Sequence, residues 1–148
     1  MIIRKATLED FPQIDAFDVF ALDRKAEINR GEILVAIIDD KIAGYITHNK
    51  NFYGGAFVQF VCVNDCFKKM GVAKALFAEV EKLYKEAGNK IIFSSTEDDN
   101  EIMLGFFERN NWKRSGIIYN IQKQAEIVFI KRLIDSDEEF QYYPQLYK

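Results

Sequence analysis

The chain has 148 residues, 49% hydrophobic and 29% charged, which is typical of one globular domain and not of a disordered chain. The net charge of −3 gives no general attraction to nucleic acid, and the single histidine, His48, excludes metal sites built from several histidines. Two cysteines are too few for a disulfide framework, and no run of about 18 uncharged apolar residues predicts a membrane span. We therefore expect a cytoplasmic protein with no bound metal, no nucleic-acid partner and no membrane anchor.

The first 30 residues predict one strand and two helices. Residues 2–5 favour a short strand. Thr7 or Asp10 can cap a helix that we expect to run to about Ala21, because apolar residues recur on one face at helical spacing. A polar stretch at residues 23–30 predicts a second helix.

The next segment reads as strands. Residues 33–38 and 42–47 are rich in β-branched and apolar side chains, and the three residues between them predict a hairpin turn. Two glycines at 54 and 55 interrupt the pattern. The nearly continuous apolar run at residues 56–63 that follows is typical of a strand covered on both faces.

The clearest helix is predicted over residues 71–87, where one apolar stripe recurs at helical spacing and Gly88 supplies the stop. A strand at 91–96 and a short helix at 100–109 follow. Residues 116–121 and 126–133 predict a final pair of strands. This order implies an α/β fold of the α+β type, with a mixed sheet that carries helices on its faces.

One short segment carries the main functional signal. A strand ends at Val63, a turn carries Lys68 and Lys69, and a helix starts at Gly71. The first amides of a helix have no partner within it and lie at the positive end of its dipole, so they favour phosphate oxygens. Neither the P-loop nor the dinucleotide-binding glycine pattern is present. Taken alone this signal is weak, because two lysines before a helix usually form an ordinary solvated surface.

Two segments resemble the GNAT superfamily of N-acetyltransferases. Residues 68–73, Lys-Lys-Met-Gly-Val-Ala, resemble the pyrophosphate signature R/Q-x-x-G-x-G/A, and residues 61–63 resemble the end of the family's fourth strand. Residues 100–112 resemble the segment N-x-x-A-x-x-x-Y-x-x-x-G-F, with Asn100, Phe107 and Trp112 in its spacing. The resemblance covers residues 1–133, which we take as one domain followed by a tail at 134–148.

The resemblance implies a GNAT-like fold, a mixed and mostly antiparallel sheet of about six to seven strands flanked by helices. It also implies that acetyl-CoA is the co-substrate, bound at a splay between residues 58–63 and 91–96, and that a primary amine of a small molecule, peptide or protein accepts the acetyl group by direct attack. The backbone of residues 61–63 would pair with the pantetheine arm, residues 68–74 would hold the pyrophosphate, Asn100 would bond the cofactor and Phe107 would lie beside the thioester. The implied cofactor-binding residues are Val61, Cys62, Val63, Lys68, Lys69, Met70, Gly71, Val72, Ala73, Lys74, Asn100 and Phe107.

Three positions depart from the family pattern. Lys68 replaces an arginine or glutamine, which keeps charge but loses bidentate geometry. Phe107 replaces the tyrosine whose hydroxyl usually protonates the departing thiolate, so water or Tyr119 would have to serve. Gln59 stands where a glutamate base often lies; it can orient the amine or a water but cannot accept a proton. Other candidate bases are Glu97, Asp98, Glu126 and His48, each of which also has an ordinary structural interpretation.

Other functions stay open at this stage. The missing base and acid suggest, as an alternative, an acyl-CoA-binding sensor or interaction module with little or no transferase activity. A preference for a longer acyl chain is a third reading. Cys62 and Cys66 could act as nucleophiles, although a strand cysteine is usually a small buried hydrophobe. The acidic and aromatic tail could be a solvated connector or could pack on a partner subunit, and with the final strand pair it could build a homodimer.

Overall fold

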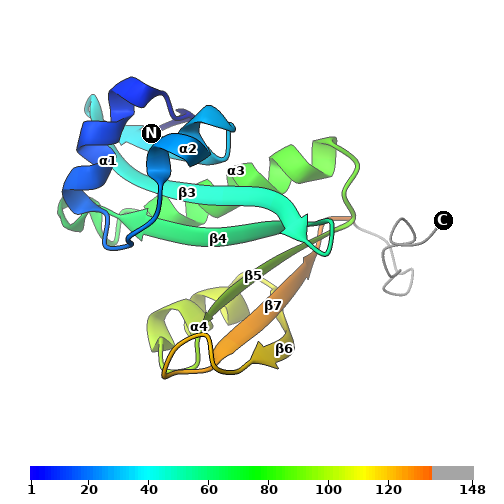
Figure 1. The fold of residues 1–148 in the computed structure, drawn as a ribbon. Coiled ribbons are helices and arrows are strands. Elements are labelled where there is room, and N and C mark those ends of the chain that lie inside the picture. Colours follow the sequence, from blue (N-terminus) through cyan, green and yellow to red (C-terminus); the bar gives the residue numbers. More distant parts are fainter. Residues whose placement is uncertain (135–148) are drawn as a thin grey trace. The chain divides into compact units, whose positions relative to one another are not determined.

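The computed structural model describes residues 1–134, so the predicted C-terminal tail lies outside the described residues apart from Ile134. The fold class is confirmed. The sheet has seven strands in the order β1-β2-β3-β4-β5-β7-β6, with helices on its faces (Figure 1). The strands are β1 (Ile2–Lys5), β2 (Ile33–Ile38), β3 (Lys41–Phe52), β4 (Gly55–Val63), β5 (Ile91–Glu97), β6 (Lys113–Ile118) and β7 (Glu126–Arg132). The helices are α1 (Phe11–Phe17), α2 (Arg24–Asn29), α3 (Val72–Glu86) and α4 (Glu101–Arg109), with 3-10 turns η1 (Leu8–Asp10) and η2 (Asp65–Phe67).

The chain forms two compact units, which we call the first unit (residues 1–49 and 58–83) and the second unit (residues 50–57 and 84 onward). In the first unit, β2 pairs antiparallel with both β1 and β3, with Val35 opposite Arg4 on one side and Tyr45 on the other. The β2–β3 turn places Asp39 and Asp40 at φ of 50° and 61°, the left-handed conformation that a tight hairpin needs. No helix within residues 1–134 is both long and apolar enough to cross a membrane.

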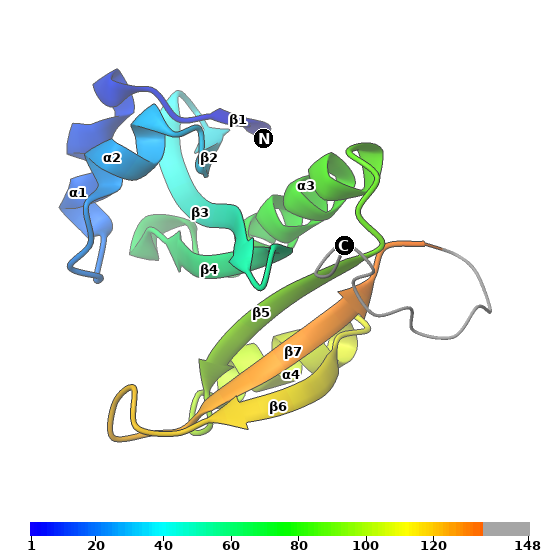
Figure 2. The ribbon, with the colours of Figure 1, turned by 45° about the vertical axis from the view of Figure 1, so that its right-hand side comes forward.

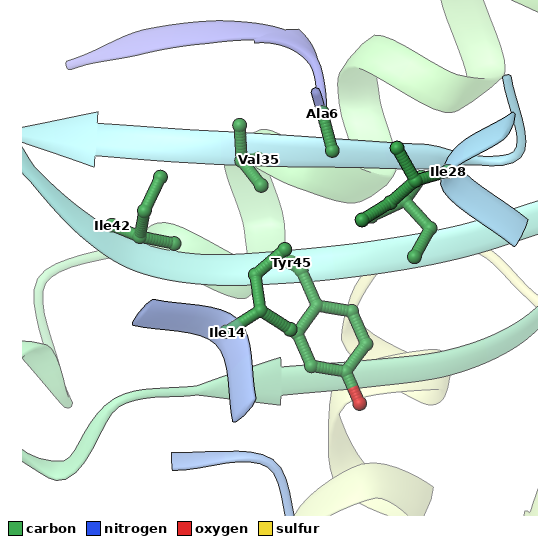
Figure 3. Packing of buried hydrophobic residues seen from close by; sticks show 7 residues of the cluster. Ala6, Ile14, Ile28, Val35, Ile42 and Tyr45 are labelled. Carbon is green, nitrogen blue, oxygen red and sulfur yellow. The ribbon is translucent and has the colours of Figure 1, made fainter. Parts of the chain in front are cut away.

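The first unit has an aliphatic core around Tyr45. Ile14 from α1 and Ile28 from α2 pack against Val35 and Ile42 of the sheet, and all are buried (Figure 3). Adjacent strand residues face opposite sides of a sheet, so Gly44 faces away from this core. A Cβ on Gly44 would lie 2.9 Å from the Val72 side chain, which places the start of α3 on that other face.

The second unit contains a three-stranded antiparallel sheet with one helix on it, together with the β3–β4 connection and the end of α3. Strand β7 lies between β5 and β6, and its Phe129 is opposite Ser94 on one side and Arg114 on the other. Helix α4 covers one face of this sheet (Figure 2). The contact centres on Phe107 of α4, whose ring stacks on Phe129 with centroids 4.4 Å apart.

The structure corrects three of the boundary and burial expectations. Helix α1 ends at Phe17 and not near Ala21, because Asp18 is extended and its side chain is drawn to Arg24 and Tyr45. Strand β6 covers Lys113–Ile118 and not residues 116–121, because its pairing with β7 starts at Lys113. Strand β4 is not covered on both faces throughout: Gln59 is exposed and the residues after it are only partly buried.

Candidate functional site

A short turn carries the chain from β4 into α3. The Asn64 N–H donates to the Ala43 carbonyl (2.8 Å), which ties the end of β4 to β3. The Asn64 side chain in turn accepts from the Cys66 N–H (3.1 Å) and caps η2. The turn is therefore anchored at its start by backbone and side-chain hydrogen bonds.

Gly71 opens the N-terminus of α3. The first hydrogen bond of this helix runs from Ala75 N–H to Gly71 O (3.0 Å), so the amides of Val72, Ala73 and Lys74 precede it and point out of the helix. Gly71 has φ +76°, and a Cβ built on it would meet nothing within 4 Å. The glycine is thus needed for its backbone conformation and leaves open space beside three outward amides, an arrangement that suits a phosphate.

The lysines of the turn are differently engaged. Lys68 forms an ion pair with Asp65 (2.7 Å), both side chains being well exposed, and this hydrogen bond raises the pKa of Lys68. Lys69 and Lys74 are also exposed, and Lys69 has φ +63°. The positive charge of Lys68, which occupies the signature position, is therefore partly neutralised by Asp65. Lys69 and Lys74 add positive charge around the start of α3.

Gly44, which the sequence analysis did not single out, sets how closely β3 approaches this region. A Cβ there would lie 2.9 Å from the Cys62 carbonyl oxygen and 2.9 Å from the Val72 side chain. Both atoms belong to residues expected to bind the cofactor. A lone glycine inside a predicted strand often marks a place where another backbone approaches closely, so the role of Gly44 could have been inferred from the sequence.

A buried ionic network underlies β4 in the first unit. Arg24 donates to Asp18 (2.8 Å), Glu27 (2.7 Å) and the Tyr45 hydroxyl (2.8 Å), and its side chain is only 2% exposed. Its guanidinium also lies 5.1 Å from the ring centre of Phe60, a β4 residue next to Gln59. No local sequence pattern predicted this network, because several of its members are far apart along the chain.

The network fixes the charges of its members. Burial raises the pKa of Asp18, but hydrogen bonds from Arg24 and Tyr45 outweigh it and hold that pKa below the usual range. Burial likewise opposes the charge on Arg24, and the two carboxylates overcome this and raise the pKa of the guanidinium. Asp18, Arg24 and Glu27 therefore form a charged cluster beside β4.

Cys62 lies next to this network on β4. Its thiol donates to the Phe17 carbonyl (3.7 Å), and burial raises its pKa. A thiol held in its neutral form is a poor nucleophile. The geometry thus argues against a cysteine-linked intermediate at Cys62.

Of the remaining candidate residues, His48 and Gln59 belong to the first unit and the others to the second. Asn100 caps α4, its side-chain oxygen accepting from the Met103 N–H (3.2 Å). Phe107 is fully buried between Phe129 and Trp112, and Tyr119 is 69% exposed just after β6. Of the alternative bases, Glu126 accepts from Gln122 (2.8 Å). Within residues 1–134, no three His, Cys, Asp or Glu side chains gather as a metal site would require.

The sequence matches a family model described as the Acetyltransferase (GNAT) family over residues 2–112. The chain belongs to this family. The match spans both resembling segments, so the expectation drawn from residues 68–73 and 100–112 is confirmed at the level of family and acetyltransferase class.

Solved structures agree with the GNAT assignment. A GNAT-family acetyltransferase from Bacillus cereus is 27% identical, with 88% of this chain and 96% of that chain covered and a TM-score of 0.77. The ribosomal-protein-S18-alanine N-acetyltransferase from Escherichia coli shares the fold at 14% identity, with 96% and 99% covered and a TM-score of 0.76. PaiA N-acetyltransferase from Thermoplasma acidophilum, solved in complex with coenzyme A, shares it at 16% identity, with 88% and 98% covered and a TM-score of 0.73. A comparison with curated protein sequences finds no match.

Proposed function

We propose that this GNAT protein transfers the acetyl group of acetyl-CoA to a primary amine of a small molecule, peptide or protein. The observation that carries the proposal is the open start of α3, where Gly71 (φ +76°) leaves room beside three outward-pointing amides. These amides suit the pyrophosphate of CoA, with Lys69 and Lys74 adding charge. A structural relative with bound coenzyme A supports the same choice of ligand.

The residues divide the work as follows. Acetyl-CoA supplies a thioester, the acyl donor. The backbone of residues 61–63 binds the pantetheine arm as an added strand would, and the exposed Gln59 orients the amine or a water. In direct transfer, the amine nitrogen forms the new C–N bond, the C–S bond breaks, the sulfur leaves with its electron pair and the amine loses one proton. The buried position and raised pKa of Cys62 argue against a covalent intermediate on that thiol.

Departure of the thiolate needs no tyrosine in this scheme. Phe107 has no hydroxyl, and because the residue is fully buried it offers no exposed ring edge either. A free thiol has a pKa of about 8.5, so the thiolate is a tolerable leaving group and can take its proton from water. The amine, with an ordinary pKa of about 10.4, must lose a proton before attack, and Gln59 cannot accept it. In this scheme the ammonium gives its proton to bulk solvent, and Gln59 orients the neutral amine that then attacks.

The test pairs two glycines of the same backbone conformation. Gly71→Ala and Gly54→Ala both place a Cβ at positive φ (+76° and +74°) in open space. Each should lower the free energy of unfolding by about 1–2 kcal/mol. Only Gly71→Ala should weaken acetyl-CoA binding, by about tenfold, because its methyl group intrudes on the phosphate. Equal affinity in the two variants, measured by calorimetry, would contradict the assignment of the pyrophosphate site.

A second candidate function is a CoA-binding module without turnover. Gln59 in place of a glutamate, together with the buried Phe107, favours it, because neither residue can move a proton. Release of free CoA from acetyl-CoA distinguishes the two functions. Amine-dependent thiol release by the intact protein supports transfer, whereas binding with no release for any amine in a broad panel supports the module.

A further inference from the structure

Strand β6 forms one edge of the sheet in the second unit. It is last in the strand order, and among residues 1–134 it pairs with β7 alone (Figure 2). All six of its residues are exposed, including Ile117 (52%) and Ile118 (38%). An edge strand carries a row of backbone N–H and C=O groups that can pair with a further strand. The side chains of residues 113–118, which we call the β6 edge, decide which strand fits there.

The two ends of the β6 edge carry opposite charges. Lys113 and Arg114 stand at its beginning, and within the described part of the chain neither belongs to an ion pair. At its other end, the register places Glu126 opposite Ile118, and Glu97 follows as the next residue across the sheet. Neither carboxylate has a cationic partner among residues 1–134. A complementary strand therefore brings an acidic end to the start of β6 and a basic end to its finish.

A second copy of the same strand meets this requirement when it runs antiparallel to the first. We propose that two copies of the chain form a symmetric dimer in which their β6 edges pair, with Lys113 of each copy opposite Ile118 of the other. The strand order across the junction is then β7-β6-β6-β7. Because a two-fold axis relates the copies, the basic end of each strand meets the acidic end of the other, and the same contact forms twice.

The pairing of β6 with β7 fixes which side chains share a face of the sheet. Residues directly opposite across a strand pair lie on the same face, and successive residues of a strand alternate between faces. Lys113 and Ile118 are both opposite even-numbered residues of β7, so they share one face. Arg114 and Ile117 are both opposite odd-numbered residues of β7, so they share the other face. The proposed register sets residues of the same face against each other, whereas a shift by one residue would not.

The middle of β6 has room for a second backbone. The register with β7 shifts between Arg114 and Gly116, which makes Ser115 the extra residue of a bulge. In the proposed dimer, Ser115 of one copy lies opposite Gly116 of the other, next to the two-fold axis. Both residues are small, and even a Cβ built on Gly116 would meet nothing within 4 Å. The centre of the β6 edge therefore does not obstruct the approach of its symmetric copy.

Apolar and charged side chains contribute differently to this interface. Ile117 and Ile118 of both copies lose exposed apolar area, which supplies most of the stabilisation. The stem of Lys113 lies across Ile118 of the second copy toward Glu126 of that copy, whose Cα is two strand spacings, or about 10 Å, away. Exposed ion pairs add little strength, so the charges mainly set the direction of pairing.

The charges also select the partner strand. A lysine on an edge strand discourages pairing with unrelated strands, whereas the symmetric register supplies the carboxylate that offsets it. One strand pair makes a small interface, so we expect a dissociation constant on the order of 10 μM.

Sedimentation equilibrium of the full chain over a range of concentrations tests the proposal. The wild-type chain should form a dimer, and Ile117→Ser with Ile118→Ser should raise the dissociation constant at least about tenfold. The matched control is Ile2→Ser with Leu8→Ser, two exposed apolar residues of the first unit (64% and 51%), which should leave the constant unchanged. Circular dichroism checks that each variant is folded. A wild-type chain that stays monomeric up to about 1 mM overturns the proposal.

A charge exchange tests the register. Lys113→Glu sets a carboxylate toward Glu126 of the other copy and should raise the dissociation constant about fivefold, and adding Glu126→Lys should restore it. The two residues lie at opposite ends of β6 within one chain, so such a rescue acts between copies. Failure of the rescue contradicts the antiparallel register. A dimer that survives Ile117→Ser with Ile118→Ser uses another surface, and β6 amides protected from hydrogen exchange in a monomer are covered by another segment of the chain; either result overturns the proposal.

Discussion

Gly44 shows how one missing side chain positions several cofactor-binding candidates. Its Cα lies where a methyl group would reach 2.9 Å from a backbone oxygen of β4 and 2.9 Å from the first residue of α3. Such a contact is closer than packed atoms tolerate. The Val72 side chain can rotate away, but the Cys62 carbonyl is part of a strand and must move with it.

Gly44→Ala is therefore expected to lower the free energy of unfolding by about 1–3 kcal/mol, from overpacking. It should also weaken acetyl-CoA binding, because the displaced Cys62 and Val72 both belong to the candidate site. Chemical denaturation and calorimetry measure the two effects. Gly116→Ala is the matched control: its Cβ meets nothing within 4 Å and its φ is not positive, so stability should change by less than about 0.5 kcal/mol. If Gly44→Ala changes neither the free energy of unfolding nor the affinity for acetyl-CoA, β3 and β4 must separate easily.

At the scale of elements, the Arg24 network fastens the connection between α1 and α2 to the sheet. Asp18 follows α1, Arg24 and Glu27 belong to α2, and Tyr45 lies on β3. Two carboxylates and one guanidinium are buried together, so removing the guanidinium leaves like charges facing each other away from water.

We expect Arg24→Met to destabilise the protein by about 3–5 kcal/mol, the usual cost of breaking a buried ion pair from one side. Arg30→Met breaks the exposed pair with Glu32, in which Arg30 is 57% exposed, and should cost less than about 1 kcal/mol. Urea unfolding of the two variants provides the comparison. Similar losses in both would mean that the buried network adds nothing beyond a surface pair.

The same network explains which elements could be predicted. Helix α3 and its start at Gly71 follow from local signals, a periodic apolar stripe and a glycine, and the structure has the helix at Val72–Glu86. The end of α1 does not follow from local signals, because the Asp18 side chain forms hydrogen bonds with Arg24 on α2 and Tyr45 on β3. The start of β6 depends on pairing with β7, and the apolar residues 117–121 suggested a later strand. Within the candidate site, the turn between β4 and α3 could be predicted from its local sequence. The contact between Arg24 and Phe60 could not, because the two residues are far apart along the chain and are brought together by the fold.

At the scale of the whole molecule, the chain has a single histidine, so the dependence of the free energy of unfolding on pH near neutrality can be assigned to one residue. Burial lowers the pKa of His48, with Glu32 opposing and Lys5 adding to the shift. The folded protein therefore binds this proton less readily than the unfolded chain, whose histidine has a pKa of about 6.5. The stability that follows is present above that value and is lost as pH falls through the folded pKa.

The free energy of unfolding should thus fall as pH is lowered from about 7.5 to 5.5, with a slope of at most about 1.4 kcal/mol per pH unit. His48→Gln should flatten the profile in this window. Asp10, whose pKa is held low mainly by its hydrogen bond with Arg4, acts in a more acidic window. Asp10→Asn should lower the free energy of unfolding by a constant amount above about pH 5, and this deficit should shrink as the pH falls below about 4. Denaturant titrations at several pH values measure both. A slope that persists without His48 would assign the effect to other groups.

The position of Trp112 has a consequence for following this protein in solution. It is the one tryptophan of the chain, it is 4% exposed, and its ring lies 5.2 Å from that of Phe107 in the second unit. Tryptophan fluorescence therefore reports directly on the packing around α4, while residues 1–49 and 58–83 contain no such fluorophore. Circular dichroism sees the backbone of both units. If the two signals change at different denaturant concentrations, the units unfold separately; if they coincide, the protein unfolds as one cooperative body.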